Sequence, residues 1–345
     1  MSTNGKNESI STFYNFVPYY YLSLDPIHVG IGGYRIGEVD NIVVREPSSR
    51  IPYIPATTIA GASRAYSALI KQKLDCAHQQ KMCGKDDCPI CFTYGFTNGN
   101  DSRKSKVIFY DLNILLFPIR IDNERGYITS PNVIRSFFLD KPNPEFRDDI
   151  QHIKDNEYVV LQTKGVSITT SDIGKFNLEK KNSNIDLTHT KTFNKDKLFT
   201  QLPSQIRDYL DPFTVYMVSD RMFSILVNDN MEVRTSVSID PMTGSAISGG
   251  LYTYESIPRF TIFHHSIWFE KELPKPETNE PNKAKVDIQK LVKDSFQLIE
   301  GIGLGGMTTR GMGRLKQYEE NTVSSNYDES MDDTTKQDTP SPEGV

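Results

Sequence analysis

Long hydrophobic runs and a secretory signal are both missing from this chain of 345 residues. Its longest apolar stretches, such as residues 112–119, are far shorter than the roughly 20 residues that a membrane-spanning helix needs. We therefore expect a cytoplasmic protein without a membrane partner. Disorder throughout is excluded as well, because 37% of the residues are hydrophobic and suffice for the core of one elaborated domain or two small ones.

An excess of basic residues, the usual mark of a nucleic-acid-binding protein, is also missing, since the formal net charge is -5. Residues 318–345 hold eight acidic residues and one Lys, which leaves 38 basic and 36 acidic residues in the rest of the chain. Composition therefore neither requires nor excludes RNA, because a local groove rather than a global excess collects phosphates.

Alternating apolar residues predict strands over residues 13–24, 39–45 and 106–119. Helical spacing predicts a helix from Thr58 to Ile70, with Thr57 or Thr58 as its N-cap, and another over residues 286–300. The second half also predicts a helix, a hairpin that turns at DPMTG, and a strand, over residues 220–227, 232–254 and 259–269. Residues 122–205 are polar and irregular, which is typical of a large insertion with mobile parts.

These blocks mix strands, helices and hairpins instead of alternating strand and helix. The pattern favours an α+β fold, a modified ferredoxin-like (RRM-like) domain with insertions. We expect this domain to span residues 1–317, with a zinc-binding insertion at about residues 75–92 and a thumb or hairpin insertion at about residues 122–205. A disordered acidic tail is expected over residues 318–345, because its composition cannot supply a core.

All four cysteines lie within sixteen residues: Cys76, Cys83, Cys88 and Cys91. Thiolates this close can occupy the corners of a tetrahedron about 2.3 Å from one Zn²⁺ ion, whereas unrelated buried thiols would scatter along the chain. His78 is an alternative ligand to Cys76. Four protein ligands leave no position for water, so we expect this zinc to be structural rather than catalytic.

Six glycines and two arginines gather in residues 301–314. The first six residues have the form of the dinucleotide-binding motif GxGxxG, but a helix precedes them and an extended segment follows, the reverse of what that motif requires. A backbone without side chains can approach phosphates closely, so this glycine loop is a candidate RNA contact. The proposed contacts are Gly305, Gly306, Thr308, Arg310 and Arg314. A flexible connector is the alternative.

The loop has the form GGxTTxGxG after the last helix, and it resembles the signature of the repeat-associated mysterious protein superfamily of CRISPR systems. In the front half, HVGIGG, GEVDNIVVREP and PYIPATTIAGASR are similar to that family's glycine turn, its Ile-Asp-x-x-Val-x-Arg-Glu segment and its helix start. Further on, VSDRMFSILV, LLFPIRIDNERGYITSP and the hairpin segment resemble the backbone subunit of the Cmr (III-B) module. Ala56 and Ala60 depart from the family's Gly and Lys, so one expected phosphate contact is missing.

The resemblance implies a subunit that polymerises in multiple copies along guide RNA, beside other type III effector subunits, and cleaves the paired target RNA as an endoribonuclease. It assigns cleavage to Asp40, where a carboxylate can hold Mg²⁺ or another divalent cation, or orient the attacking 2′-hydroxyl. A lone Asp in a loop is otherwise a turn residue. His28 is a second catalytic candidate or an RNA contact, with a core role as the alternative. Glu255 is most simply the partner of an Arg.

For guide RNA we also nominate Thr57, Thr58 and Arg64, because N–H groups and the dipole at a helix start favour anions. The resemblance further implies a hairpin that wedges between bases of the guide-target duplex, and we expect it within residues 163–202. The rival functions are a non-catalytic structural or filament-capping subunit, a guide-processing nuclease with a His base, and a zinc-stabilised protein-interaction module. Asp40 in its matching segment favours the cutting subunit.

Overall fold

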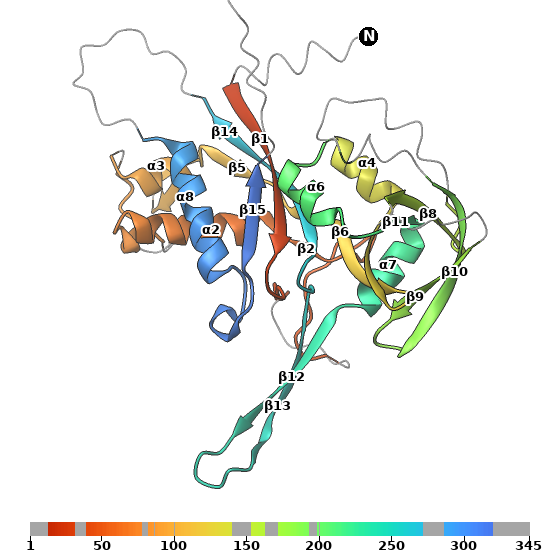
Figure 1. Ribbon diagram of the computed structural model, residues 1–345. Helices are drawn as coiled ribbons and strands as arrows, with labels where there is room; N and C mark the ends of the chain where they lie inside the picture. Colours follow the sequence, from red (N-terminus) through yellow and green to blue (C-terminus); the bar gives the residue numbers. More distant parts are fainter. Residues whose placement is uncertain are drawn as a thin grey trace, which may run out of the picture.

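The computed structural model describes residues 13–31, 39–77, 82–85, 87–99, 101–139, 153–162, 172–192, 199, 201–271 and 286–319. They form a mixed α+β fold around one large sheet, as the sequence predicts (Figure 1). Among these residues, no helix combines the length and the apolar character that crossing a bilayer requires.

One half of the fold is an antiparallel sheet with two helices on one face. Its strands run in the order β15-β1-β14-β6, and α2 lies against α8. Side chains of β1 alternate between the two faces, so Tyr19 and Tyr21 contact Phe296 of α8 while Tyr20 contacts Phe137 on the other side. The bounds are β1 Tyr14–Ser23, α2 Ala56–Ile70, β6 Leu112–Ile121, β14 Ile262–Glu270, α8 Ile288–Ile302 and β15 Leu315–Glu319.

The same sheet continues past β6 through β7, β11, β8, β10 and β9. The bounds in this second half are β7 Glu124–Thr129, α4 Pro131–Leu139, β8 Glu157–Gln162, β9 Ile173–Leu178, β10 Ser183–Thr192, α6 Ser204–Leu210, β11 Val215–Val218 and α7 Asp220–Asp229. Residues 122–205 therefore contribute four strands to the main sheet instead of the irregular insertion that we expected. The strands are short, and β10 pairs with β8 in parallel, so their pairing is not visible in the local pattern.

A long hairpin, β12 (Glu232–Ile239) and β13 (Ala246–Ser256), extends away from the body of the protein (Figure 1). Its turn is the expected DPMTG, where the Gly244 amide donates to the Asp240 carbonyl at 2.8 Å. Met242 at the tip is 91% exposed. By contrast, the hairpin that lies within residues 163–202, β9 with β10, is built into the sheet. The projecting hairpin is thus not the one that we selected from sequence.

All three predicted helices are present, as α2, α7 and α8, with a different cap than expected at the first. The first residue of α2 is Ala56, and its amide donates to Asp111 Oδ1 at 2.7 Å, so neither Thr57 nor Thr58 is the N-cap. At α8, Asp287 caps the helix by accepting from the Lys290 amide. The far end of α2 does not reach the core, because Leu69 is 48% exposed.

Short elements complete the chain. They are β2 Tyr53–Ile54, a 3₁₀ turn at Leu74–Ala77, α3 Pro89–Tyr94, β3 Phe96–Asn98, β4 Asp101–Arg103, β5 Val107–Phe109 and a 3₁₀ turn at Thr308–Arg310. The segment from the 3₁₀ turn at Leu74–Ala77 to β4 lies beside the C-terminal end of α2 and carries the cysteines. Most of the predicted acidic tail, residues 320–345, lies outside the described residues.

Buried His265 predicts a loss of stability in mild acid. Burial lowers the pKa of His265 to about 3, and its Nδ1 lies 2.7 Å from the Tyr110 carbonyl oxygen. Below the ordinary pKa of about 6.5 the unfolded chain binds a proton at this residue and the folded chain does not. The free energy of unfolding should therefore fall by roughly 2 kcal/mol between about pH 7 and pH 5 from this group alone.

Urea unfolding of the native chain and of His265→Gln at both pH values measures this contribution. Glutamine retains a donor for the Tyr110 carbonyl but does not titrate, so the variant should lose less stability on acidification. Equal losses in the two proteins would contradict the prediction.

Candidate nucleic-acid interface and cysteine cluster

The root of the hairpin is organised by Glu255, which is 2% exposed. Its carboxylate accepts from Arg45 Nη2 at 2.7 Å, from Lys180 Nζ at 3.0 Å and from the Val43 amide at 3.3 Å. Burial alone would raise the pKa of Glu255, but Arg45 and Lys180 outweigh burial and hold the pKa below its usual value. The interpretation of Glu255 as the partner of an Arg is confirmed.

Asp40 lies beside the same root. Its Oδ2 accepts from the Thr253 amide at 2.7 Å and from the Thr253 hydroxyl at 3.1 Å, and the Asp40 amide donates back to that hydroxyl at 3.0 Å. Within the part of the chain that the structure describes, Oδ1 accepts no hydrogen bond. The half-buried carboxylate is thus fixed through one oxygen.

His28 connects the hairpin root to the glycine loop. Its Nδ1 lies 2.6 Å from the Glu255 carbonyl oxygen, which can only accept, so Nδ1 carries the proton. Its own carbonyl accepts from the Gly306 amide at 2.8 Å. The ring is 7% exposed, and its Nε2 faces Gly30. This environment gives His28 a positioning role in the fold.

Close packing accounts for Gly303, Gly305 and Gly313, whereas nothing lies within 4 Å of a Cβ at Gly301 or Gly311. A Cβ at Gly305 would lie 2.6 Å from the His28 carbonyl oxygen, and the φ angle of Gly305 is +81°. The amides of Gly306 and Gly313 are already used, because they donate to the carbonyls of His28 and Pro26. These two N–H groups are therefore not available to a phosphate, contrary to the expectation that the loop glycines aim their amides at one.

The 3₁₀ turn of the loop, Thr308–Arg310, carries the exposed Thr309 and Arg310, and Gly305, Gly311 and Arg314 are exposed as well. Arg310 donates to the hydroxyl of Tyr252 in β13, and its guanidinium lies 5.7 Å from the centre of that ring. Arg314 pairs with Asp25 through contacts of 2.5 and 3.1 Å. The structure thus places three candidates along one segment of β13. Arg310 contacts Tyr252, Asp40 contacts Thr253, and His28 contacts Glu255. Sequence reasoning missed Tyr252 and Thr253, which contact Arg310 and Asp40 respectively.

Three of the nominated RNA contacts, Thr57, Thr58 and Arg64, lie on α2. Thr57 and Thr58 lie on the first turn of α2, where the Asp111 carboxylate already binds the first amide. Arg64 points to the cysteine segment, where it donates to the carbonyls of Cys76 and Gly95 at 2.8 and 2.9 Å. Arg64 therefore holds the backbone of the cysteine segment and is not free for RNA.

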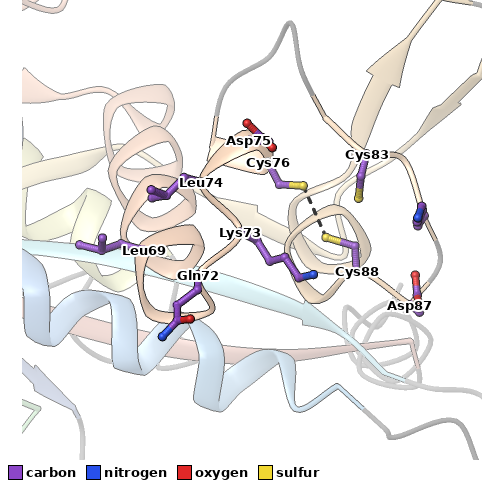
Figure 2. Close-up of a pocket in the computed structure, with 10 residues that line it drawn as sticks. Leu69, Gln72, Lys73, Leu74, Asp75, Cys76, Cys83, Asp87 and Cys88 are labelled. Atoms are coloured by element: carbon purple, nitrogen blue, oxygen red, sulfur yellow. Dashed lines mark hydrogen bonds between the residues drawn. The ribbon is translucent and has the colours of Figure 1, made fainter.

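The four cysteine sulfurs lie within 4.8 Å of one another. Cys76 and Cys88 have sulfurs 3.6 Å apart, and those of Cys83 and Cys91 are 3.8 Å apart. A tetrahedron with Zn–S bonds of about 2.3 Å has edges of about 3.8 Å, so these separations fit one metal ion such as Zn²⁺. Figure 2 shows Cys76, Cys83 and Cys88 at the wall of a pocket of about 560 Å³. The alternative ligand His78 lies outside the described residues.

The fold and the site define an α+β protein with a glycine loop packed against the root of a projecting hairpin. The chain belongs to the RAMP superfamily, whose family model matches residues 22–316.

Curated relatives agree with this family. The chain is similar to the CRISPR system Cmr endoribonuclease Cmr4 of Pyrococcus furiosus, with 24% identity over 307 residues that cover 85% of this chain and 92% of the relative. A shorter match to the CRISPR system Cms endoribonuclease Csm3 of Methanothermobacter thermautotrophicus is 34% identical over 71 residues and covers 20% of this chain and 28% of the relative.

Solved structures share the fold. A chain of the type III-B Cmr-beta complex bound to cognate target RNA has a TM-score of 0.58 and 18% identity, with 89% of this chain and 98% of that chain covered. Oligomeric Cmr4 from Pyrococcus furiosus has a TM-score of 0.55 and 20% identity, with 89% and 100% covered.

Removing the Glu255 carboxylate should destabilise the protein. In Glu255→Ala the buried Arg45 loses its counter-charge, which typically costs about 3 to 5 kcal/mol of unfolding free energy. The matched control is Asp294→Ala, which breaks an exposed pair with Lys290 and should cost less than about 1 kcal/mol. Denaturant unfolding compares the two; similar small losses would show that the hairpin root does not depend on this carboxylate.

The cysteine cluster predicts one tightly held zinc per chain, measurable by elemental analysis. Cys88→Ser should lose the metal and unfold the segment locally.

Arg64→Ala should retain the ligands but lose zinc at a chelator concentration roughly 10-fold lower than the native chain does, because the backbone carbonyls of the segment lose their hydrogen-bond donor. Lys104→Ala, an exposed cation outside the cluster, is the control. A metal-free native chain with unchanged melting would contradict the prediction.

Proposed function

We propose that the chain is the repeating backbone subunit of a type III CRISPR effector complex of the Cmr type. In this role it binds guide RNA and cleaves the paired target RNA. Membership of the RAMP superfamily and similarity to Cmr4 along 85% of the chain support the class of protein. Similarity to a chain of a Cmr complex with target RNA and to oligomeric Cmr4 supports RNA, other subunits and further copies of itself as partners.

The observation that carries the catalytic part is the fixed carboxylate of Asp40 at the hairpin root. Cleavage needs a group that holds the attacking 2′-hydroxyl near the scissile phosphate, and Oδ1 of Asp40 has no partner among the described residues. Mg²⁺ or another divalent cation is the proposed cofactor, with Asp40 as one oxygen ligand. Arg310 and Thr308 on the exposed turn are the proposed phosphate contacts, with Arg314 beside them.

The remaining assignments follow from the fold. The strand order β15-β1-β14-β6 with α2 and α8 on one face supports a ferredoxin-like (RRM-like) core, within a domain of residues 1–317. Residues 75–92 form its proposed zinc-binding insertion. We now place the thumb at β12–β13, because this hairpin projects and carries exposed apolar residues that can wedge between bases, including Val237, Met242 and Leu251.

The test is target cleavage by the assembled complex. Asp40→Ala should assemble on guide RNA and bind target RNA with near-native affinity, because a carboxylate contributes little attraction for phosphates. Cleavage should fall by at least ~10²-fold, the lower end of what one positioned acid-base group supplies. Asp40→Asn retains an oxygen that accepts from Thr253 but loses the charge, so it should fail as well.

Asp294→Asn, which changes a partly exposed carboxylate on α8, is the control and should cleave normally. Native cleavage by Asp40→Asn would make Asp40 a turn residue. The cleaving group would then have to be sought elsewhere, on this chain or on another subunit.

A further inference from the structure

Three cations lie over aromatic rings around Tyr209 of α6. Arg125 is 4.3 Å from the ring centre of Phe213 and 4.6 Å from that of Phe260, so its guanidinium contacts both rings. Arg259 lies 4.2 Å from the Phe260 ring. In β15, Lys316 lies 5.6 Å from the ring of Tyr318. We call this set the cation–aromatic strip: Arg125, Arg259, Lys316, Phe213, Phe260 and Tyr318.

The strip is assembled from distant segments. Tyr209 stacks on Phe260 with ring centres 6.5 Å apart and contacts Phe213 at 5.7 Å. Tyr318 lies opposite Tyr20 in the pairing of β15 with β1, and the Tyr20 hydroxyl donates to the Gln201 carbonyl, just before α6, at 3.0 Å. The rings of Tyr209, Phe213, Phe260 and Tyr318 are all half-buried, so each is anchored in the fold and still partly open.

Phe260 is held in a backbone conformation that bulky residues rarely adopt. Its φ is +72°, which costs on the order of 1–3 kcal/mol for a residue with a large side chain. The conformation is fixed by two hydrogen bonds: the Phe260 amide donates to the Ser23 carbonyl at 2.8 Å, and the Tyr127 hydroxyl donates to the Phe260 carbonyl at 3.2 Å. The fold thus accepts strain at the ring that two arginines share.

The charges of the strip are unpaired. Arg125, Arg259 and Lys316 are exposed, and none of them forms an ion pair with a described residue. Some other arginines of the protein do form ion pairs, such as Arg45 with Glu255 and Arg314 with Asp25. A guanidinium that lies with its face on a ring keeps the N–H groups of its edge available, so both arginines are oriented for a ligand with anionic oxygens.

We propose that the cation–aromatic strip is a second contact for single-stranded RNA, in which the rings stack on bases and the three cations bind phosphates. This inference rests on the proposed function and extends the RNA path beyond the glycine loop. The two surfaces adjoin, because Ser23 accepts from the Phe260 amide and the next residue, Leu24, donates to the Arg314 carbonyl at 2.9 Å. Stacking with backbone contacts is sequence-tolerant, which suits a guide whose sequence varies.

The test measures binding of the full-length chain to a labelled oligouridine over a range of salt concentrations. Replacing Arg125, Arg259 and Lys316 together by Ala should weaken binding at least about 10-fold and reduce the slope of log K against log salt by about 2, since each phosphate contact on a single strand contributes roughly 0.7. Phe260→Leu should weaken binding about fivefold or more with an unchanged slope, because it removes stacking and keeps the charges.

Arg221→Ala is the matched control, because Arg221 is exposed, lies on α7 and pairs with Asp155 outside the strip. It should leave affinity and slope unchanged, and melting curves should show that every variant is folded. Arg310→Ala reports on the glycine loop in the same assay.

The outcomes separate the two proposals. If Arg310→Ala weakens RNA binding while the triple variant binds like the native chain, the strip is not an RNA contact and the proposed function stands. If the triple variant retains RNA affinity but no longer self-associates in sedimentation, the strip is an interface between copies and the inference is overturned. If the native chain binds no RNA at all, the proposed function fails together with the strip.

Discussion

One buried ionised carboxylate, that of Glu255, fixes the arrangement of the site. Its side chain joins Arg45 and Val43 from one segment to Lys180 from the turn after β9. Its backbone joins Asn41 and His28, through the Asn41 carbonyl and the His28 imidazole. Burying a charge is costly unless it is paired and hydrogen-bonded, and here both cations and an amide meet that condition. The projecting hairpin can therefore leave the body in one defined direction, with Asp40 at its root.

The glycine loop also depends on Glu255, through His28. His28 is held by Glu255, and the carbonyl of His28 receives the Gly306 amide, so the loop follows the hairpin root. Gly305 is needed for this close approach, because a Cβ there would lie 2.6 Å from the His28 carbonyl oxygen. What remains for a ligand is the exposed turn that carries Arg310, whose guanidinium returns to the hairpin at Tyr252.

Local patterns in the sequence predicted the elements that depend on nearby residues. The helix over residues 286–300, the hairpin at DPMTG and the proximity of four cysteines all follow from short-range spacing. Pairing between strands that are distant in the sequence could not be predicted from local spacing. Because β10 pairs with β8 in parallel, with a register shift, residues 122–205 were interpreted as an irregular insertion. Arg64 was misassigned for a similar reason. A helix start attracts anions in general, and only the fold shows that this arginine is used by backbone carbonyls of the cysteine segment.

The hydrogen bonds that each side chain already makes distinguish the three catalytic candidates at the hairpin root. Both oxygens of Glu255 are used, and Arg45 with Lys180 keeps the carboxylate ionised and inaccessible. His28 has its Nδ1 proton committed to a carbonyl and its other nitrogen against the backbone of Gly30. Asp40 has one oxygen fixed by Thr253 and one without a described partner. A general base or cation ligand must combine a fixed position with free capacity, and of the three acid-base candidates at the hairpin root only Asp40 has both.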